Sequence, residues 1–207
     1  DVITGNGGAD VMLGGAGNDT FVLNADNALK LARNSGNTAQ NIARINGGNG
    51  IDTIKLDSAN LDLTAVQNAA IDGIERINLN GNSSTLKMGK LDVIQLSQDN
   101  NAFNTTNGWT VTSSGGATGW GAVNRYAQVV VDGDNTNTLN LSNSWTNIGT
   151  VQNTANGVTT VYKVLQSTSA AAQVLVANNV QVRMAPSVVT TANELPSTLN
   201  YTEAQSS

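Results

Sequence analysis

The residues most able to do chemistry in this sequence are aspartates that each close a glycine-rich run. Asp10 and Asp19 lie nine residues apart, and Asp52 closes a similar run later in the chain. The glycines allow a backbone loop whose carbonyl oxygens can turn toward one point, and the aspartate adds a carboxylate. Such hard oxygen ligands on a flexible loop favour Ca²⁺ over transition metals. The pattern therefore predicts calcium binding.

Each glycine-rich run is followed by a short apolar segment, and the two together repeat every nine residues. Complete units span residues 5–13, 14–22 and 47–55, and residues 1–4 form the second half of another. These units follow the pattern G-G-x-G-x-D-x-U-x, in which U is a large apolar residue on a very short strand. We expect the side chains at U to form one apolar line inside a stack of turns, and they are Ile3, Met12, Phe21 and Ile54.

The spacing of the units also suggests how the loops pair. If successive loops alternate between two sides of a roll, an ion lies between one loop and the next but one. We therefore predict that residues 23–46 bulge out as an insertion and that the 47–52 loop stacks on the 5–10 loop. The ligands of the shared ion would be carboxylates of Asp10 and Asp52 and carbonyls of Gly5, Gly7, Gly47 and Asn49, at roughly 2.3–2.6 Å. The 14–19 loop would lie on the other side, with Gly14, Ala16 and Asp19 as ligands and Asp57 as a candidate partner.

Two other groups of residues have alternative interpretations. Asp132 and Asp134 could bind a second calcium ion together with Asn137, or they could form a tight turn between two strands. A role as a catalytic acid and base has no further support in the sequence. The three tryptophans could stack on sugar rings, but we expect them to fill a β core, and they are Trp109, Trp120 and Trp145.

The rest of the chain favours strands. From residue 53 onward, short β-prone runs alternate with Asn, Gly, Asp and Ser turns, and the clearest are 53–56, 74–79, 85–88, 93–96, 109–112, 127–131, 138–141, 159–165, 173–177 and 180–184. Short helices are expected only inside the insertion, at 28–33 after a cap in 24–27 and at 39–45. The predicted fold is all-β: a short parallel β-roll that continues into a β-solenoid or β-sandwich.

This pattern divides the chain into three parts. Residues 1–56 are predicted to form the β-roll turns with a partly helical insertion at 23–46, and residues 57–185 an all-β domain. Residues 186–207 are polar and without periodicity, as in a tail or linker. The chain begins inside a repeat without a signal sequence, so we interpret it as a module of a longer protein.

Composition excludes several classes of function. The net charge is −5 and the pI is near 4.5, so the chain offers no basic surface for nucleic acid. It contains no histidine, which removes the commonest general base and zinc ligand, and we expect no enzymatic activity. No apolar run is long enough for a membrane span. Twelve of the fifteen acidic residues are aspartate, the residue of tight turns and calcium loops.

The repeats resemble the RTX (repeats-in-toxin) family, whose members leave bacteria by type I secretion. The segments 21–24, 45–54, 71–77 and 131–139 resemble the C-terminal region of giant RTX adhesins. The resemblance implies a secreted module of the bacterial cell surface that folds on binding Ca²⁺ and mediates adhesion and biofilm formation through an unknown carbohydrate or protein ligand. Two alternatives remain: a surface-layer lattice protein, or an accessory module of a secreted enzyme.

Overall fold

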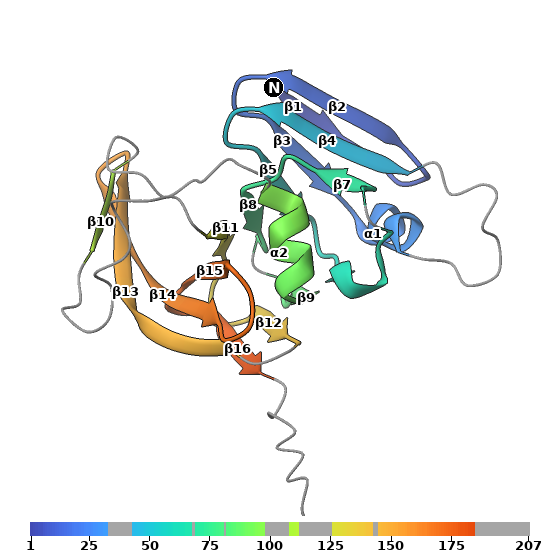
Figure 1. Cartoon of the computed structure of the whole chain (residues 1–207). Helices are drawn as coiled ribbons and strands as arrows, with labels where there is room; N and C mark the ends of the chain where they lie inside the picture. The colour runs from blue at the N-terminus through green and yellow to red at the C-terminus, as the bar shows by residue number, and fades with distance from the viewer. Residues whose placement is uncertain are drawn as a thin grey trace, which may run out of the picture.

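Successive turns of the chain stack on one another in the computed structural model, which describes residues 1–32, 43–67, 69–80, 82–97, 108–111, 126–142 and 145–184. Each turn adds one parallel strand to the same nine-stranded sheet (Figure 1). These strands are, in spatial order, β1 (Val2–Thr4), β3 (Thr20–Leu23), β5 (Thr53–Leu56), β8 (Arg76–Asn78), β11 (Ala127–Asp132) and β15 (Ala172–Ala177). Parallel strands contributed by successive turns define a solenoid.

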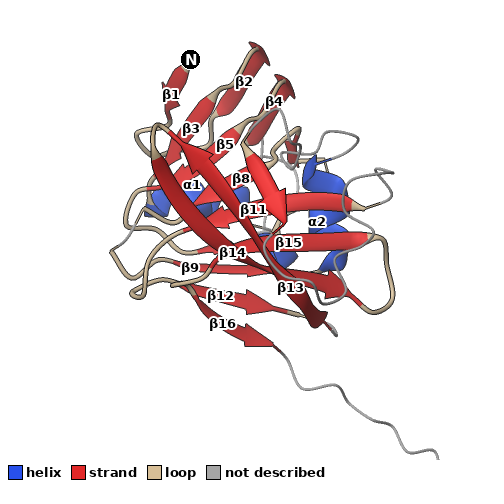
Figure 2. Cartoon of the chain, turned by 90° about the vertical axis from the view of Figure 1, so that its left-hand side faces the viewer, coloured by secondary structure: helices blue, strands red, loops and turns tan. Residues whose placement is uncertain are grey.

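Two smaller parallel sheets close the other faces of the turns (Figure 2). A three-stranded sheet contains β2 (Val11–Ala16), β4 (Arg44–Asn49) and β7 (Ile71–Asp72). A four-stranded sheet contains β6 (Leu61–Asp62), β9 (Thr85–Met88), β12 (Thr138–Leu141) and β16 (Gln181–Met184). The prediction of an all-β fold is therefore confirmed, and the later turns continue the roll as a solenoid.

The core is built from ladders of apolar residues at equivalent positions of successive turns. One ladder runs through the nine-stranded sheet and contains Ile3, Phe21, Ile54, Ile77, Val131 and Val176. Met12 does not belong to this ladder, so the prediction that Met12 shares one apolar line with Ile3, Phe21 and Ile54 is wrong. Met12 pairs instead with Ile45 in the three-stranded sheet. The reason is that one full turn takes two nine-residue units, so consecutive units contribute to opposite sheets.

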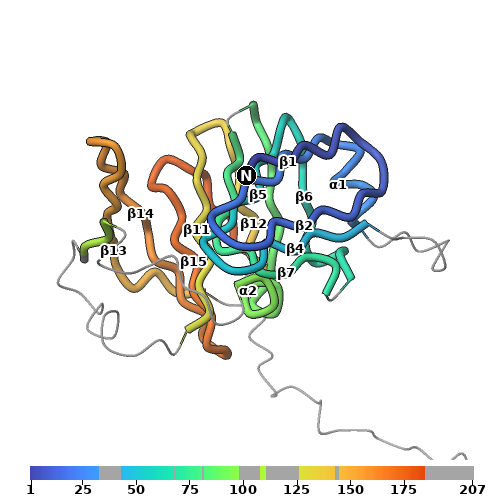
Figure 3. The backbone as a smooth tube through the Cα atoms, turned by 90° about the horizontal axis from the view of Figure 1, so that it is seen from above, coloured from blue at the N-terminus to red at the C-terminus, as the bar shows by residue number. Residues whose placement is uncertain are grey.

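An antiparallel hairpin extends the nine-stranded sheet beyond β15. Strand β14 (Val158–Ser167) pairs with β15, β13 (Trp145–Ala155) pairs with β14, and β10 (Trp109–Val111) lies last. Asn156 and Gly157, both with positive φ, form the two-residue turn between β13 and β14. The hairpin lies at the opposite end of the molecule from the first turns (Figure 3).

Helices occupy two connections. Helix α1 (Ala25–Leu31) begins in the predicted cap, where Asn24 accepts hydrogen bonds from the backbone of Asp26 and Asn27. Helix α2 (Lys90–Ser97) replaces the predicted strand 93–96, because Val93 and Leu96 lie on the one helix face that packs toward β11 and β15. A single 3₁₀ turn, η1 (Leu63–Ala65), follows β6.

Other expected elements differ in extent. Residues 44–45 of the expected helix 39–45 belong to β4, and the remainder of that helix lies largely outside the described residues. The nine-stranded sheet passes from β5 to β8 across the boundary expected after residue 56. The expected tail, 186–207, lies outside the described residues.

Candidate metal centre

The 14–19 and 47–52 loops stack directly on each other. Strands β2 and β4 pair in a register that places Gly15 beside Gly48 and Ala16 beside Asn49. The Gly17 N–H donates to the Asn49 carbonyl at 2.8 Å. A Cβ on Gly48 would overlap the Gly15 carbonyl, and both glycines have positive φ. Glycine is therefore required for the two loops to approach this closely.

This pairing corrects the predicted one, in which the 47–52 loop stacked on the 5–10 loop and Asp10 shared an ion with Asp52. The chain does re-enter the same roll after the insertion, because β5 pairs with β3. However, the insertion joins β3 to β4 and so takes one loop position itself. The 47–52 loop consequently lies three loops after the 5–10 loop, on the opposite side of the roll.

The two sides of the roll differ in what they contain. We call the side with Asp19 and Asp52 the aspartate side, and the side with the 5–10 loop and α1 the helix side. Asp57 lies at the end of β5, where its backbone N–H donates to Leu23 at 2.8 Å. This position belongs to the helix side, so Asp57 is not placed beside the 14–19 loop as predicted.

On the aspartate side, acidic residues occupy the same position in successive turns. Asp1, Asp19 and Asp52 each accept, through the backbone carbonyl, a hydrogen bond from the first residue of the strand in the next turn. The Asp52 Oδ1 accepts from the Asp19 N–H at 2.7 Å, and Glu75 Oε2 accepts from the Asp52 N–H at 2.9 Å. We call Asp19, Asp52 and Glu75 the acidic column.

Each carboxylate of the acidic column has one buried oxygen without a hydrogen-bond donor among the described residues. Asp19 is 2% exposed, and Asp52 and Glu75 are 0% exposed. A Cβ on Gly14 would lie 2.5 Å from both the Asp19 Oδ2 and the Gly47 carbonyl oxygen, so these two oxygens face the same small space. Buried acceptors that face other acceptors are unfavourable unless a cation lies between them. These residues fit a calcium ion.

The electrostatics of the acidic column support the same conclusion. Burial raises the pKa of the Asp52 carboxyl, and the Asp19 charge raises it further against the hydrogen bond from the Asp19 N–H. Burial, together with the Asp52 charge, raises the pKa of Glu75 to about 7.

Backbone oxygens must supply most of the ligands of such an ion. In the described ranges, no three His, Cys, Asp or Glu side chains converge as a metal-binding group. Calcium takes six to eight oxygen ligands and accepts backbone carbonyls readily. The stacked glycine loops provide carbonyls, and the acidic column provides the charge.

The helix side has a different arrangement, in which α1 closes the 5–10 loop. The Asn27 amide nitrogen donates to Asp10 Oδ2 at 2.9 Å and to the Gly8 carbonyl at 3.3 Å. The Asn27 Oδ1 accepts from the Gly7 N–H at 3.0 Å, and Asp26 accepts from the Gly8 N–H at 2.7 Å. A Cβ on Gly5 would overlap the Asn27 side chain. The amide of Asn27 thus supplies hydrogen-bond donors to the Asp10 carboxylate and the Gly8 carbonyl.

We expect Asn27→Ala to destabilise the fold by about 1–3 kcal/mol, because it leaves the Gly7 N–H and the Asp10 carboxylate without their partner. The loss should be similar in calcium and in chelator, since this contact involves no ion. Thermal melting of the variant under both conditions measures it, with Lys30→Ala on the exposed face of α1 as a control. A loss seen only in calcium would contradict this role of Asn27.

The second predicted site does not assemble around one point. Arg76 pairs with Asp132, and the Tyr162 hydroxyl donates to Asp132 Oδ1 at 2.7 Å. Asp134 Oδ1 accepts from the backbone and hydroxyl of Thr136 at 2.8 and 2.6 Å, which is a tight turn. Both aspartates therefore have protein partners, and the tight-turn interpretation describes this segment.

The described tryptophans lie in the core, as expected. Trp109 is buried and its ring lies 4.9 Å from that of Tyr162. Trp145 is also buried, and its indole N–H donates to the Ser142 carbonyl at 2.9 Å. Trp120 lies outside the described residues. Neither described ring is placed to stack on a sugar.

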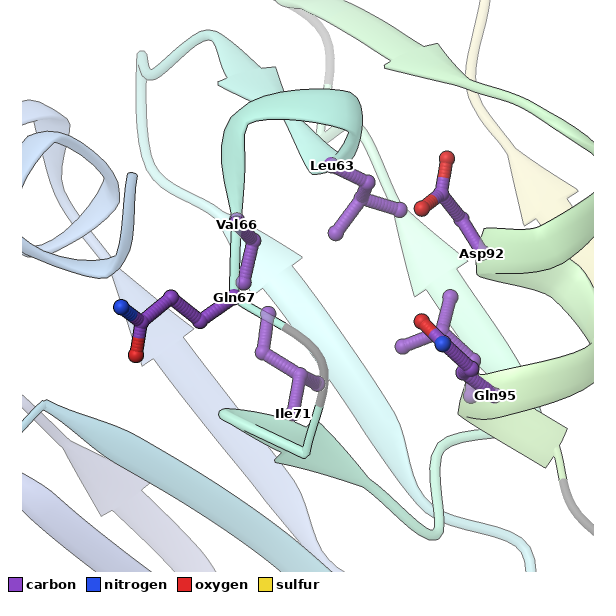
Figure 4. Close-up of a pocket in the computed structure, with 7 residues that line it drawn as sticks. Leu63, Val66, Gln67, Ile71, Asp92 and Gln95 are labelled. Carbon is purple, nitrogen blue, oxygen red and sulfur yellow. The ribbon is translucent and has the colours of Figure 1, made fainter. Parts of the chain in front are cut away.

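A cavity of about 20 Å³ lies between η1, β7 and α2 (Figure 4). It holds no more than about one water molecule. Its lining mixes apolar and polar side chains and consists of Leu63, Val66, Gln67, Ile71, Asp92, Gln95 and Leu96. This cavity is therefore too small to be a substrate site.

Sequence reasoning missed Glu75, although a signal was present. Asp1, Asp19 and Asp52 each precede by two residues the apolar residue of the ladder, namely Ile3, Phe21 and Ile54. Glu75 precedes Ile77 by the same interval. The turn at 72–75 lacks the glycine-rich run, so a search for the complete nine-residue unit does not find it.

Comparison with known proteins agrees with the geometry of the first turns. Residues 1–27 match the family model of the RTX calcium-binding nonapeptide repeat, in four copies. Searches of curated proteins and of solved structures found no match. Among the described helices, none is long and apolar enough to cross a membrane.

Proposed function

We propose, from the RTX calcium-binding repeats that the chain carries, that it is a calcium-switched structural module through which a secreted bacterial protein mediates attachment at the cell surface. RTX repeats bind Ca²⁺ and are typical of secreted proteins. The observation that carries the proposal is the acidic column, in which Asp19, Asp52 and Glu75 each have a buried oxygen with no donor in the part of the chain that the structure describes.

The acidic column explains why folding should depend on calcium. Without an ion, two or more carboxylates must lose water while they repel one another, and the glycine-rich loops lose much backbone entropy. A bound Ca²⁺ supplies positive charge at this position. Asp19 and Asp52 would hold it together with carbonyls of the stacked 14–19 and 47–52 loops. Binding and folding are then one event.

Such a module responds to the difference in calcium concentration across the cell envelope. Extracellular calcium modules bind at about 10⁻⁴ to 10⁻³ M. The chain would therefore remain loosely folded inside the cell and become rigid outside. A non-enzymatic role is consistent with the absence of histidine from the chain and with the engagement of Asp132 by Arg76 and Tyr162.

We expect attachment to require the acidic column. Bacteria whose surface protein carries both Asp19→Asn and Asp52→Asn should be retained severalfold less in a flow chamber with millimolar calcium than wild-type cells. Antibody labelling must show equal amounts of both proteins on the cells, and Asp57→Asn is the matched control. Equal retention of wild-type and doubly substituted cells would rule out the adhesive role.

A further inference from the structure

We propose that a second calcium ion binds one turn further along the solenoid, between the 47–52 loop and the 72–75 turn, with Glu75 as a carboxylate ligand. This inference rests on the proposed function, because it extends calcium binding on the aspartate side. Neither Glu75 nor its turn falls within the matched repeats, which end at residue 27.

The 72–75 turn repeats the hydrogen bonds of the loops before it. The Arg76 N–H donates to the Asp52 carbonyl at 3.0 Å, as the Thr53 N–H donates to the Asp19 carbonyl at 2.8 Å. The Glu75 carboxylate accepts from the Asp52 N–H, as the Asp52 carboxylate accepts from the Asp19 N–H. Glu75 therefore occupies, relative to Asp52, the same position that Asp52 occupies relative to Asp19 one turn earlier.

The backbone of this turn also approaches the loop below it closely. A Cβ on Gly47 would overlap the Gly73 carbonyl oxygen and would lie 2.5 Å from the Asp52 Oδ2. The carbonyl and the carboxylate oxygen thus border the same space, as the Gly47 carbonyl and Asp19 Oδ2 do one turn earlier. Gly73 has φ of 62°, a left-handed conformation that glycine adopts without strain.

The side chains at this position lack partners in a way that points to a cation. Glu75 Oε1 and Asp52 Oδ2 are fully buried without a donor among the described residues. The positive charge of Arg76, the next residue in the chain, does not compensate these carboxylates. Its guanidinium pairs instead with Asp132 and donates to the Tyr162 hydroxyl. Two buried carboxylates with a facing carbonyl form a hard oxygen site, and Ca²⁺ is the ion that tolerates few charged ligands in an irregular shell.

Counting the ions bound per chain tests this inference. In native mass spectrometry with calcium, Glu75→Gln should bind one ion fewer than the wild-type chain. Asp19→Asn should also lose one ion, from the neighbouring position, and Asp57→Asn should lose none. Glu75→Gln keeps the acceptor for the Asp52 N–H, and circular dichroism of each variant in calcium checks that it is folded.

Each outcome distinguishes this inference from the proposal on which it rests. If Glu75→Gln binds as many ions as the wild type while Asp19→Asn loses one, the second site is refuted and calcium-dependent folding stands. If the wild-type chain binds no calcium, both are refuted. A loss of one ion in Glu75→Gln, with Asp57→Asn unchanged, supports the site.

Discussion

Removing calcium should lower the melting temperature of this chain by about 3–22 °C. At 10 mM Ca²⁺ and the affinities typical of extracellular modules, each bound ion stabilises the folded state by roughly 1.4–2.7 kcal/mol. In a domain of this size, each kcal/mol shifts the melting temperature by about 2–4 °C. The estimate covers one to two ions on the aspartate side. Differential scanning calorimetry in 10 mM calcium and in chelator measures the difference.

Acidity should change this difference in a defined direction. The pKa of Glu75 is raised to about 7 in the folded chain from an ordinary value of 4.5, so the folded state without calcium favours the protonated form. In chelator, the contribution of Glu75 to stability is therefore fully present below about pH 4.5 and is lost as the pH rises through 7. The melting temperature in chelator should be higher at pH 5 than at pH 8. The difference in melting temperature between calcium and chelator should therefore be smaller at pH 5.

Magnesium is the control for specificity. Mg²⁺ needs a small octahedral site and loses water reluctantly, so it should stabilise the chain far less than Ca²⁺ at the same concentration. Identical melting curves in calcium and in chelator would refute calcium-dependent folding. Equal stabilisation by the two ions would show that the acidic column acts only through general charge screening.

The substitution Asp52→Asn should have opposite effects with and without calcium. Asp52 lies between Asp19 and Glu75 and borders both proposed ion positions. In calcium the variant loses a charged ligand, and its melting temperature should fall below that of the wild type by several degrees. In chelator it removes a buried negative charge while the amide oxygen still accepts from the Asp19 N–H, so its melting temperature should rise.

The exposed Asp57 provides a matched control for this reversal. Asp52 directly precedes β5 and Asp57 directly follows it, on the helix side. Asp57→Asn removes the same charge there, so it should change the melting temperature little under both conditions. Destabilisation of Asp52→Asn in both calcium and chelator would mean that Asp52 acts through hydrogen bonding alone and holds no ion.

The repeat could be predicted from the sequence because residues within each nine-residue unit specify its turn and its strand. Glycines at the stacked loops and an apolar residue two positions after each aspartate specify turns such as 14–19 and strands such as Thr53–Leu56, which the structure has as expected. Strand Trp145–Ala155 was not predicted, since it is mainly polar and its pairing with β14 depends on the hairpin turn and on the sheet beside it. Likewise, Val93 and Ile94 are β-prone residues, but the segment that contains them becomes helical because of packing.

The pairing of loops could not be predicted, because it depends on how many loop positions the insertion takes. Because the insertion takes one loop position, Asp52 lies beside Asp19 and not, as predicted, beside Asp10. In the sequence, Asn27 is only part of a candidate helix cap, and only the folded chain brings its amide to the Asp10 carboxylate. Long-range relationships of this kind are not encoded in the spacing of neighbouring residues.

The antiparallel hairpin has a consequence for self-association in solution. Beyond β15, strands β14 and β13 reverse the strand direction, and the terminal strand β10 has only three residues. So short a terminal strand presents few unpaired N–H and C=O groups to another chain. We therefore expect this end of the sheet to be a poor template for edge-to-edge pairing, so that concentrated preparations do not elongate into fibrils from it.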